Sequence, residues 1–247
     1  MENVYHKFHI PVMGTGHSID SPIRLAHLGI SSVMSIVDDI LIEKICKHYS
    51  EKYSIDFVET AKSDPYARSK RITAYLNVVD KIVALKLNEI KLLPFEAGNE
   101  KTKYFDLLPD ESPLKKKYNY FLTIETEAEK EKVAAELTNL MRAGSIDVNI
   151  MSKLDRTNYA KDGTILSDEF NDAKAALRGY AESTLTSSIV FSAGFNRTLL
   201  GYLEQFKDFY RDANGKIKKK IIIKVSDFRS AMIQGKFLAS KGLEVSE

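Results

Sequence analysis

Hydrophobic and polar positions along the chain form a succession of two patterns. Short, nearly continuous apolar runs, typical of buried parallel strands, lie near residues 10, 33, 147, 189 and 222. Apolar residues that recur about every 3.6 positions predict helices over 40–49, 64–92, 125–142, 167–186, 197–210 and 231–241. A sixth strand begins near residue 243. This order predicts an α/β protein with a parallel sheet.

The stretch from Ile10 to Asp39 contains the first complete strand-helix-strand unit. An apolar strand over 10–13 stops at Gly14-Thr15-Gly16, where two glycines let the backbone turn sharply and approach a ligand. Pro22 suits the first turn of a short helix, and 32–37 predicts the second strand. Loops at the carboxyl ends of parallel strands are where α/β proteins bind ligands. A tight turn without a ligand would explain the same glycines.

The number of strands favours a barrel-type fold that is incomplete. We expect (βα) repeats of the TIM-barrel type with about five to six strands in one domain, 1–247, whereas a closed barrel needs eight. An open parallel sheet is the alternative. Residues 64–142 predict a helical and irregular insertion after the second strand, for which a lid or a dimer contact is a hypothesis. Because the final strand has no helix after it, we expect an N-terminal fragment of a longer protein.

Composition narrows the class of protein without indicating a partner. The chain has 36 basic and 34 acidic residues, which leaves a formal charge of +2. A net charge this small gives no indication that the protein binds nucleic acid or an anionic membrane. The single cysteine, Cys46, excludes an internal disulfide and fits a reducing compartment. No run approaches the roughly 20 apolar residues that span a bilayer. We expect a cytoplasmic protein that acts on a small molecule, with a possible homo-oligomeric state.

Three further positions carry candidate chemistry. Ser192 and Gly194 are small residues at the end of a predicted strand, as Gly14 and Gly16 are at the end of the first strand. Lys224 lies inside the predicted strand 221–225, where it could serve catalysis or extend its amine to water from the surface. His17 could act as an acid or base at the mouth of a barrel, although a loop histidine is more often polar surface. The histidines show no metal-ligand spacing.

The opening segment IPVMGTG, followed by SPIRLAHLGISSVMSI, resembles the first βαβ unit of flavin-dependent TIM barrels of the nitronate monooxygenase type, also called 2-nitropropane dioxygenase-like. In that family the first strand ends in a Pro-x-x-x-Gly-x-Gly-like segment. A short helix with a glycine-rich end follows, and Gly29 to Val33 fills that place here with fewer glycines. The resemblance covers about 30 residues, and the FMN domain of glutamate synthase is a related comparison.

This resemblance implies an FMN cofactor and a monooxygenase-like oxidoreductase activity. It implies that the backbone of Met13, Gly14 and Thr15 lies against the flavin ring, with Gly16 in the same loop. Lys224 would face the pyrimidine edge, where a cation stabilises the reduced ring. We group the second small-residue strand end, Ser192 and Gly194, with the cofactor site. The family's Gly-Gly-His segment and phosphate-binding glycine loops follow the sixth strand and have no counterpart here.

Two other functions fit the same residues. A lysine on an inner barrel strand can have its pKa lowered by burial and can form a Schiff base, so Lys224 could belong to an aldolase-like lyase. Alternatively, the chain is a non-catalytic fragment or binding module, in which the glycines serve turns and the last strand packs on a missing segment. Borohydride trapping on Lys224 and flavin binding distinguish these hypotheses.

Overall fold

The computed structural model describes residues 9–10, 19–36, 38–151, 156–192 and 194–246. Their strands form a parallel sheet in the order β1-β2-β3-β4-β5, which is also their order in the sequence. The bounds are β1 His9–Ile10, β2 Ser31–Ile36, β3 Ile146–Met151, β4 Ser188–Ser192 and β5 Lys220–Ile223. The predicted α/β class with a parallel sheet is confirmed. A closed barrel is not seen among the described residues.

The predicted sixth strand is present only as a single parallel bridge. Val245 pairs with Ile221 of β5, and the N–H of Ser246 donates to the carbonyl of Ile221 at 2.7 Å. The chain therefore continues to add neighbours to the sheet in sequence order. This is the connectivity expected of successive βα units.

The helices follow most of the predicted ranges, with the differences given below. Their bounds are α1 Ser21–Leu25, α2 Asp39–Lys52, α3 Ala67–Leu92, α4 Glu100–Asp106, α5 Pro113–Leu122, α6 Glu127–Leu140, α7 Asp172–Ala181, α8 Arg197–Tyr202 and α9 Phe228–Ala239. Helices α4 and α5 were not predicted, because the segment 94–113 contains three prolines, one of which, Pro113, occupies the first turn of α5. The helix predicted over 197–210 ends at Tyr202 and gives way to 3-10 turns. Helix α9 begins three residues early, capped by Asp227.

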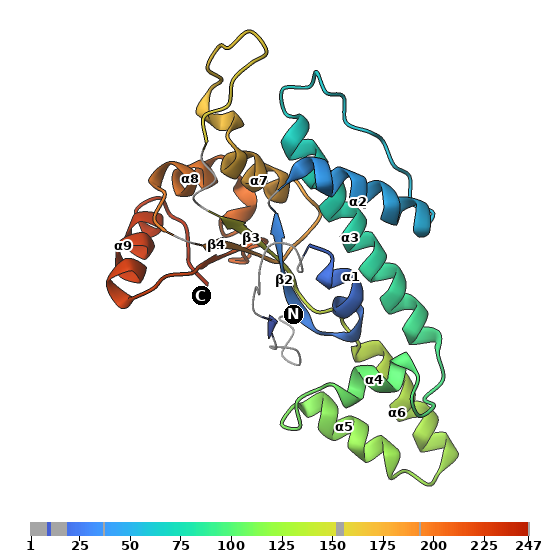
Figure 1. The fold of residues 1–247 in the computed structure, drawn as a ribbon. Coiled ribbons are helices and arrows are strands. Elements are labelled where there is room, and N and C mark those ends of the chain that lie inside the picture. Colours follow the sequence, from blue (N-terminus) through green and yellow to red (C-terminus); the bar gives the residue numbers. More distant parts are fainter. Residues whose placement is uncertain (1–8, 11–18, 37, 152–155, 193, 247) are drawn as a thin grey trace.

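The two faces of the sheet differ in chemistry. Alternate strand residues such as Met34, Val148 and Ile189 belong to the main apolar core together with side chains of the helices. In Figure 1 the helices α3, α7, α8 and α9 lie in an arc around the sheet. The opposite face carries polar residues that are also buried, including Ser35 and Asn149. One face is thus an apolar helix-packing surface and the other is partly polar.

The region 64–142 contributes to two apolar clusters. The first part of α3 contributes Tyr75, Leu76 and Val79 to the main core, and α3 packs against both α2 and α7. A second cluster starts at Leu87 and joins the end of α3 to α4, α5 and α6. These helices form a separate group at the far end of α3 (Figure 1). Tyr104 and Phe105 belong to this cluster, and Phe95 packs against it.

Candidate functional site

A cleft of about 550 Å³ lies at the carboxyl ends of β4 and β5. It brings together three of the predicted site residues, Ser192, Gly194 and Lys224. The other residues that line it are Phe195, Val225, Ser226, Ser230, Ile233 and Gln234. A volume of this size is within the range of small-molecule and cofactor sites, and the mixture of apolar walls with a few polar groups is typical of them.

Strand pairing sets the positions of Ser192 and Lys224. Phe191 pairs with Ile223, and the N–H of Lys224 donates to the carbonyl of Phe191 at 2.8 Å. Ser192 and Lys224 are the next residues on these adjacent parallel strands, so they leave the sheet at the same edge. Gly194 follows with a φ of 116°, a backbone conformation that favours glycine. The sequence pattern of small residues after a strand therefore predicted a real turn into this cleft.

Lys224 differs from its prediction in two respects. It follows β5, which ends at Ile223, instead of lying inside a strand over 221–225, and its side chain is exposed. The ladder stops at Ile223 because the chain turns there toward α9. An exposed amine lacks the burial on which the Schiff-base hypothesis depends. Lys224 is instead placed as a charged group on the rim of the cleft.

Helix α9 forms one wall of the cleft through Ser230, Ile233 and Gln234. Its first turn is fixed by Asp227, whose Oδ1 accepts from the N–H of Ser230 at 2.8 Å and whose Oδ2 accepts from the hydroxyls of Ser226 and Ser230. The backbone hydrogen bond from Ser230 and the hydroxyl bonds lower the pKa of Asp227. This ionised cap holds the β5–α9 loop against the start of the helix.

Gln234 is a cleft residue that the sequence analysis missed. The residue is only 4% exposed, and its carboxamide forms no hydrogen bond with a described residue but is not among the fully buried unpaired polar atoms, so it reaches the solvent of the cleft. Gln234 and Leu238 are the buried residues of α9 and are four positions apart. A polar residue at an apolar stripe position of a helix was the available signal, because buried polar groups usually have partners.

Five of the predicted site residues, Met13, Gly14, Thr15, Gly16 and His17, lie outside the described residues. Their roles stay predictions. The described remainder of the opening unit has the expected form, with Pro22 in the first turn of α1 and Gly29 at a φ of 80° ending the turn that follows.

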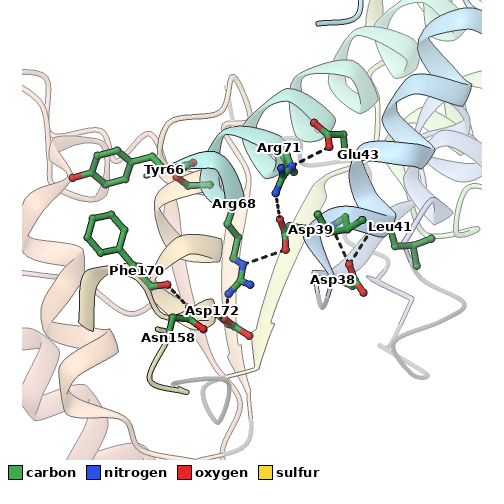
Figure 2. Close-up of polar contacts among 12 residues, drawn as sticks. Asp38, Asp39, Leu41, Glu43, Tyr66, Arg68, Arg71, Asn158, Phe170 and Asp172 are labelled. Carbon is green, nitrogen blue, oxygen red and sulfur yellow. Dashed lines mark hydrogen bonds and ion pairs between the residues drawn. The ribbon is translucent and has the colours of Figure 1, made fainter. Parts of the chain in front are cut away.

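A second, more charged cleft of about 250 Å³ lies at the carboxyl end of β2. Its polar wall is an ion-pair network that joins α2, α3 and α7 (Figure 2). Arg68 donates from Nε to Asp39 at 3.1 Å and also pairs with Asp172. Asn158 donates from Nδ2 to Asp172 at 3.3 Å and to the carbonyl of Phe170 at 2.6 Å.

The charged side chains of this second cleft have structural roles. Asp38 caps α2 by accepting from the N–H groups of Ile40 and Leu41, at 2.9 and 3.0 Å. Asp39 is satisfied by two arginines, so the charged groups of the wall are occupied with each other. The ion pairs and hydrogen bonds of this network connect α2, α3 and α7. The cleft at β4 and β5, which contains an unpartnered carboxamide, is the better candidate for binding.

The described ranges contain neither a cluster of metal-ligating side chains nor a membrane-spanning helix. No group of three or more His, Cys, Asp or Glu side chains within them is placed to hold a metal ion. None of their helices is both long and apolar enough to cross a membrane.

Comparison with known proteins gives no relative. No family model, no curated protein and no solved structure matches the chain.

Proposed function

We propose that this chain is part of a flavin-dependent oxidoreductase barrel of the nitronate monooxygenase type, and that it binds FMN in the cleft at the carboxyl ends of β4 and β5. The observation that carries the proposal is that Ser192, Gly194 and Lys224 line this one cleft. They were selected from separate segments of the sequence. Their shared position is what a common cofactor site requires.

The two faces of the sheet support the barrel part of the proposal. Open parallel sheets are covered by helices on both faces, and their strands are apolar throughout. Here the row formed by Ser35, Asn149, Val190 and Ile222 runs across four strands on the face opposite the helices. Asn149 donates from Nδ2 to Ser35 Oγ at 3.3 Å within this row. Inward-facing side chains in layers of this kind fill the interior of a barrel.

The side chains of the cleft suit a flat heterocycle with a polar edge. Phe195, Val225 and Ile233 supply apolar surface, while Lys224, Gln234 and three serines supply polar groups. When bound, the flavin would supply the redox chemistry. Lys224 would hold a positive charge beside the ring, and the apolar groups would exclude water from its faces. His17 stays a predicted acid or base for this reaction.

Flavin fluorescence provides a direct test of FMN binding. We expect FMN to be quenched saturably by the protein, at one FMN per chain. Lys224→Met should weaken binding about tenfold, as expected for loss of one charge-assisted interaction. The matched control is Lys236→Met, because Lys236 is exposed on α9 and does not line the cleft.

The results that would contradict the proposal are equally specific. Wild-type protein that fails to quench FMN saturably would remove the cofactor. Equal affinities for the wild type and the Lys224 variant would show that FMN binds elsewhere. Reductive trapping of a carbonyl compound on Lys224 would instead favour the lyase.

A further inference from the structure

Helix α9 has a second apolar face, which is exposed to solvent. On its buried face Leu238 packs in the main core. On the other face Phe228 is 80% exposed and Met232 is 43% exposed. Gly235 and Ala239 continue this exposed line, because the four residues follow at steps of four, three and four positions. Figure 1 shows α9 at the outer end of the arc of helices. A helix that is apolar on both sides is normally covered on both sides.

Side-chain size changes in one direction along this exposed face. Phe228 and Met232, nearer the start of the helix, are large. Gly235 and Ala239, nearer its end, are small. A Cβ added at Gly235 would meet no atom within 4 Å, so the space above this residue is open. When two such faces pack antiparallel, each large residue lies opposite a small residue of the other face, which is the alternation that lets packed layers interdigitate.

We propose that two copies of this chain associate through the exposed face of α9 as an antiparallel, two-fold symmetric helix pair. In a two-fold dimer every contact occurs twice. Met232 of each copy packs over Gly235 of the other. In the same way Phe228 packs over Ala239. An unrelated partner has no reason to present this order of sizes in reverse, so the self-complementary order identifies a second copy as the occupant.

Two charged groups on this face determine how the dimer responds to salt. Arg229 and Lys236 are exposed on α9, and neither pairs with a carboxylate among the described residues. In the antiparallel pair, Arg229 of one copy lies near Lys236 of the other, and the two cations repel. Added salt screens this repulsion and should tighten the dimer, whereas an association made through ion pairs weakens as salt is added.

The dimer face and the cleft lie on opposite sides of α9. Ser230 and Gln234, which line the cleft, point about half a helical turn away from Met232. Association therefore leaves the cleft open, and substitutions on the dimer face should leave FMN binding unchanged. The inference is thus independent of the proposed function, and either can fail without the other.

Sedimentation velocity of the full chain tests the dimer. One helix face buries little area, so we expect a reversible dimer with a Kd on the order of 10 µM. Gly235→Met places a large residue opposite Met232 and should weaken association at least about tenfold. The double variant Met232→Ala/Gly235→Met restores a large residue opposite a small one and should recover association to within about threefold. The control is Leu122→Met, because Leu122 is an exposed apolar residue of α5.

Thermal unfolding at concentrations where the wild type is monomeric separates association from folding. The open space at Gly235 means that Gly235→Met should unfold at or above the wild-type temperature. A wild type that stays monomeric far above the expected Kd would overturn the inference. Wild-type association in Gly235→Met, or loss of association in Leu122→Met, would overturn the assignment to α9. A double variant that stays monomeric would overturn the antiparallel arrangement.

Discussion

Arg71 donates from Nη1 to Oδ2 of Asp39 at 2.7 Å, and both side chains are buried. The contact joins α3 to the first residue of α2 at the carboxyl end of β2. Arg71 also donates from Nε to Glu43 at 2.9 Å. Burial opposes the charge, but the hydrogen bond to Asp39 and the two carboxylates raise the pKa of Arg71 overall. The guanidinium of Arg71 therefore keeps its charge at the α2–α3 interface.

Removal of Arg71 should destabilise the protein strongly. Arg71→Met leaves Asp39 and Glu43 partly buried without one of their cations, which costs about 3 kcal/mol of unfolding free energy. Urea unfolding measures the change. The control is Arg24→Met, because the pair that Arg24 forms with Asp20 is largely exposed and should contribute little. Equal stability of the two variants would contradict the structural role assigned to this network.

Lys219 is a second residue whose replacement should strongly destabilise the protein. Its side chain is fully buried, and its Nζ donates to the carbonyls of Tyr180, Ser183 and Leu185 at 2.9, 2.8 and 2.7 Å. Burial lowers the pKa of Lys219 to about 8, so the amine still carries its proton at neutral pH. These bonds close the end of α7 and the loop that leads to β4.

The substitution Lys219→Met leaves the carbonyls of Ser183 and Leu185 without the amine that donates to them, whereas the carbonyl of Tyr180 still accepts from the N–H and hydroxyl of Ser183. We expect a loss of about 3 kcal/mol in unfolding free energy. Thermal unfolding of Lys218→Met provides the control, because the neighbouring side chain is exposed. A Lys219 variant that unfolds at the wild-type temperature would show that water replaces the amine.

His27 makes the stability depend on pH. Its ring is 1% exposed, and neither ring nitrogen has a hydrogen-bond partner among the described residues. Burial, with a smaller contribution from Lys86, lowers the pKa of His27 from 6.5 to about 4. The unfolded chain therefore binds a proton below about pH 6.5 that the folded chain does not bind until about pH 4. Stability is full above pH 6.5 and falls as the pH falls through this window.

We expect this histidine to remove up to about 3 kcal/mol of stability between pH 6.5 and pH 4. Unfolding free energies across this range would be compared for the wild type and His27→Leu, which should lack this part of the slope. The exposed His48 gives the control His48→Leu, which should retain it. Parallel curves for the wild type and His27→Leu would mean that His27 is solvated.

Gly144 is required by close packing of backbones. A Cβ at this position would lie 2.2 Å from the carbonyl carbon of Ile30, in the segment that enters β2. Gly144→Ala should therefore displace the entry to β3 and destabilise the protein by about 2 kcal/mol or more. In contrast, Gly235 of α9 has open space around its Cα, so Gly235→Ala should maintain or raise the midpoint of thermal unfolding. Comparison of the two midpoints checks the prediction.

The sequence predicted the strands and most of the helices better than it predicted which polar side chains are buried. Residues 146–151 and 188–192 form strands as expected, because short β-branched and apolar runs between helical patterns have few other structures available. Helix α5 was missed although Leu114, Tyr118 and Phe121 recur at helical spacing, because the helix begins at a proline and its first turns are rich in lysine.

In and near the candidate site, too, some residues were predicted from local sequence and others were not. Ser192, Gly194 and Lys224 were predicted because local rules place them after strands. Gln234 and Lys219 were not, since their burial depends on which helix or loop packs above them. A glutamine in an amphipathic helix and a lysine among three consecutive lysines look like surface residues until the packing is known.

Circular dichroism of FMN in the visible region tests the central proposal most directly, because a flavin held by the protein acquires a fixed chiral environment. We predict that titration with the full chain induces a visible signal that saturates at one FMN per chain and weakens in Lys224→Met. A spectrum that stays that of free FMN at every protein concentration would contradict the proposal that this fold is part of a flavin-dependent barrel.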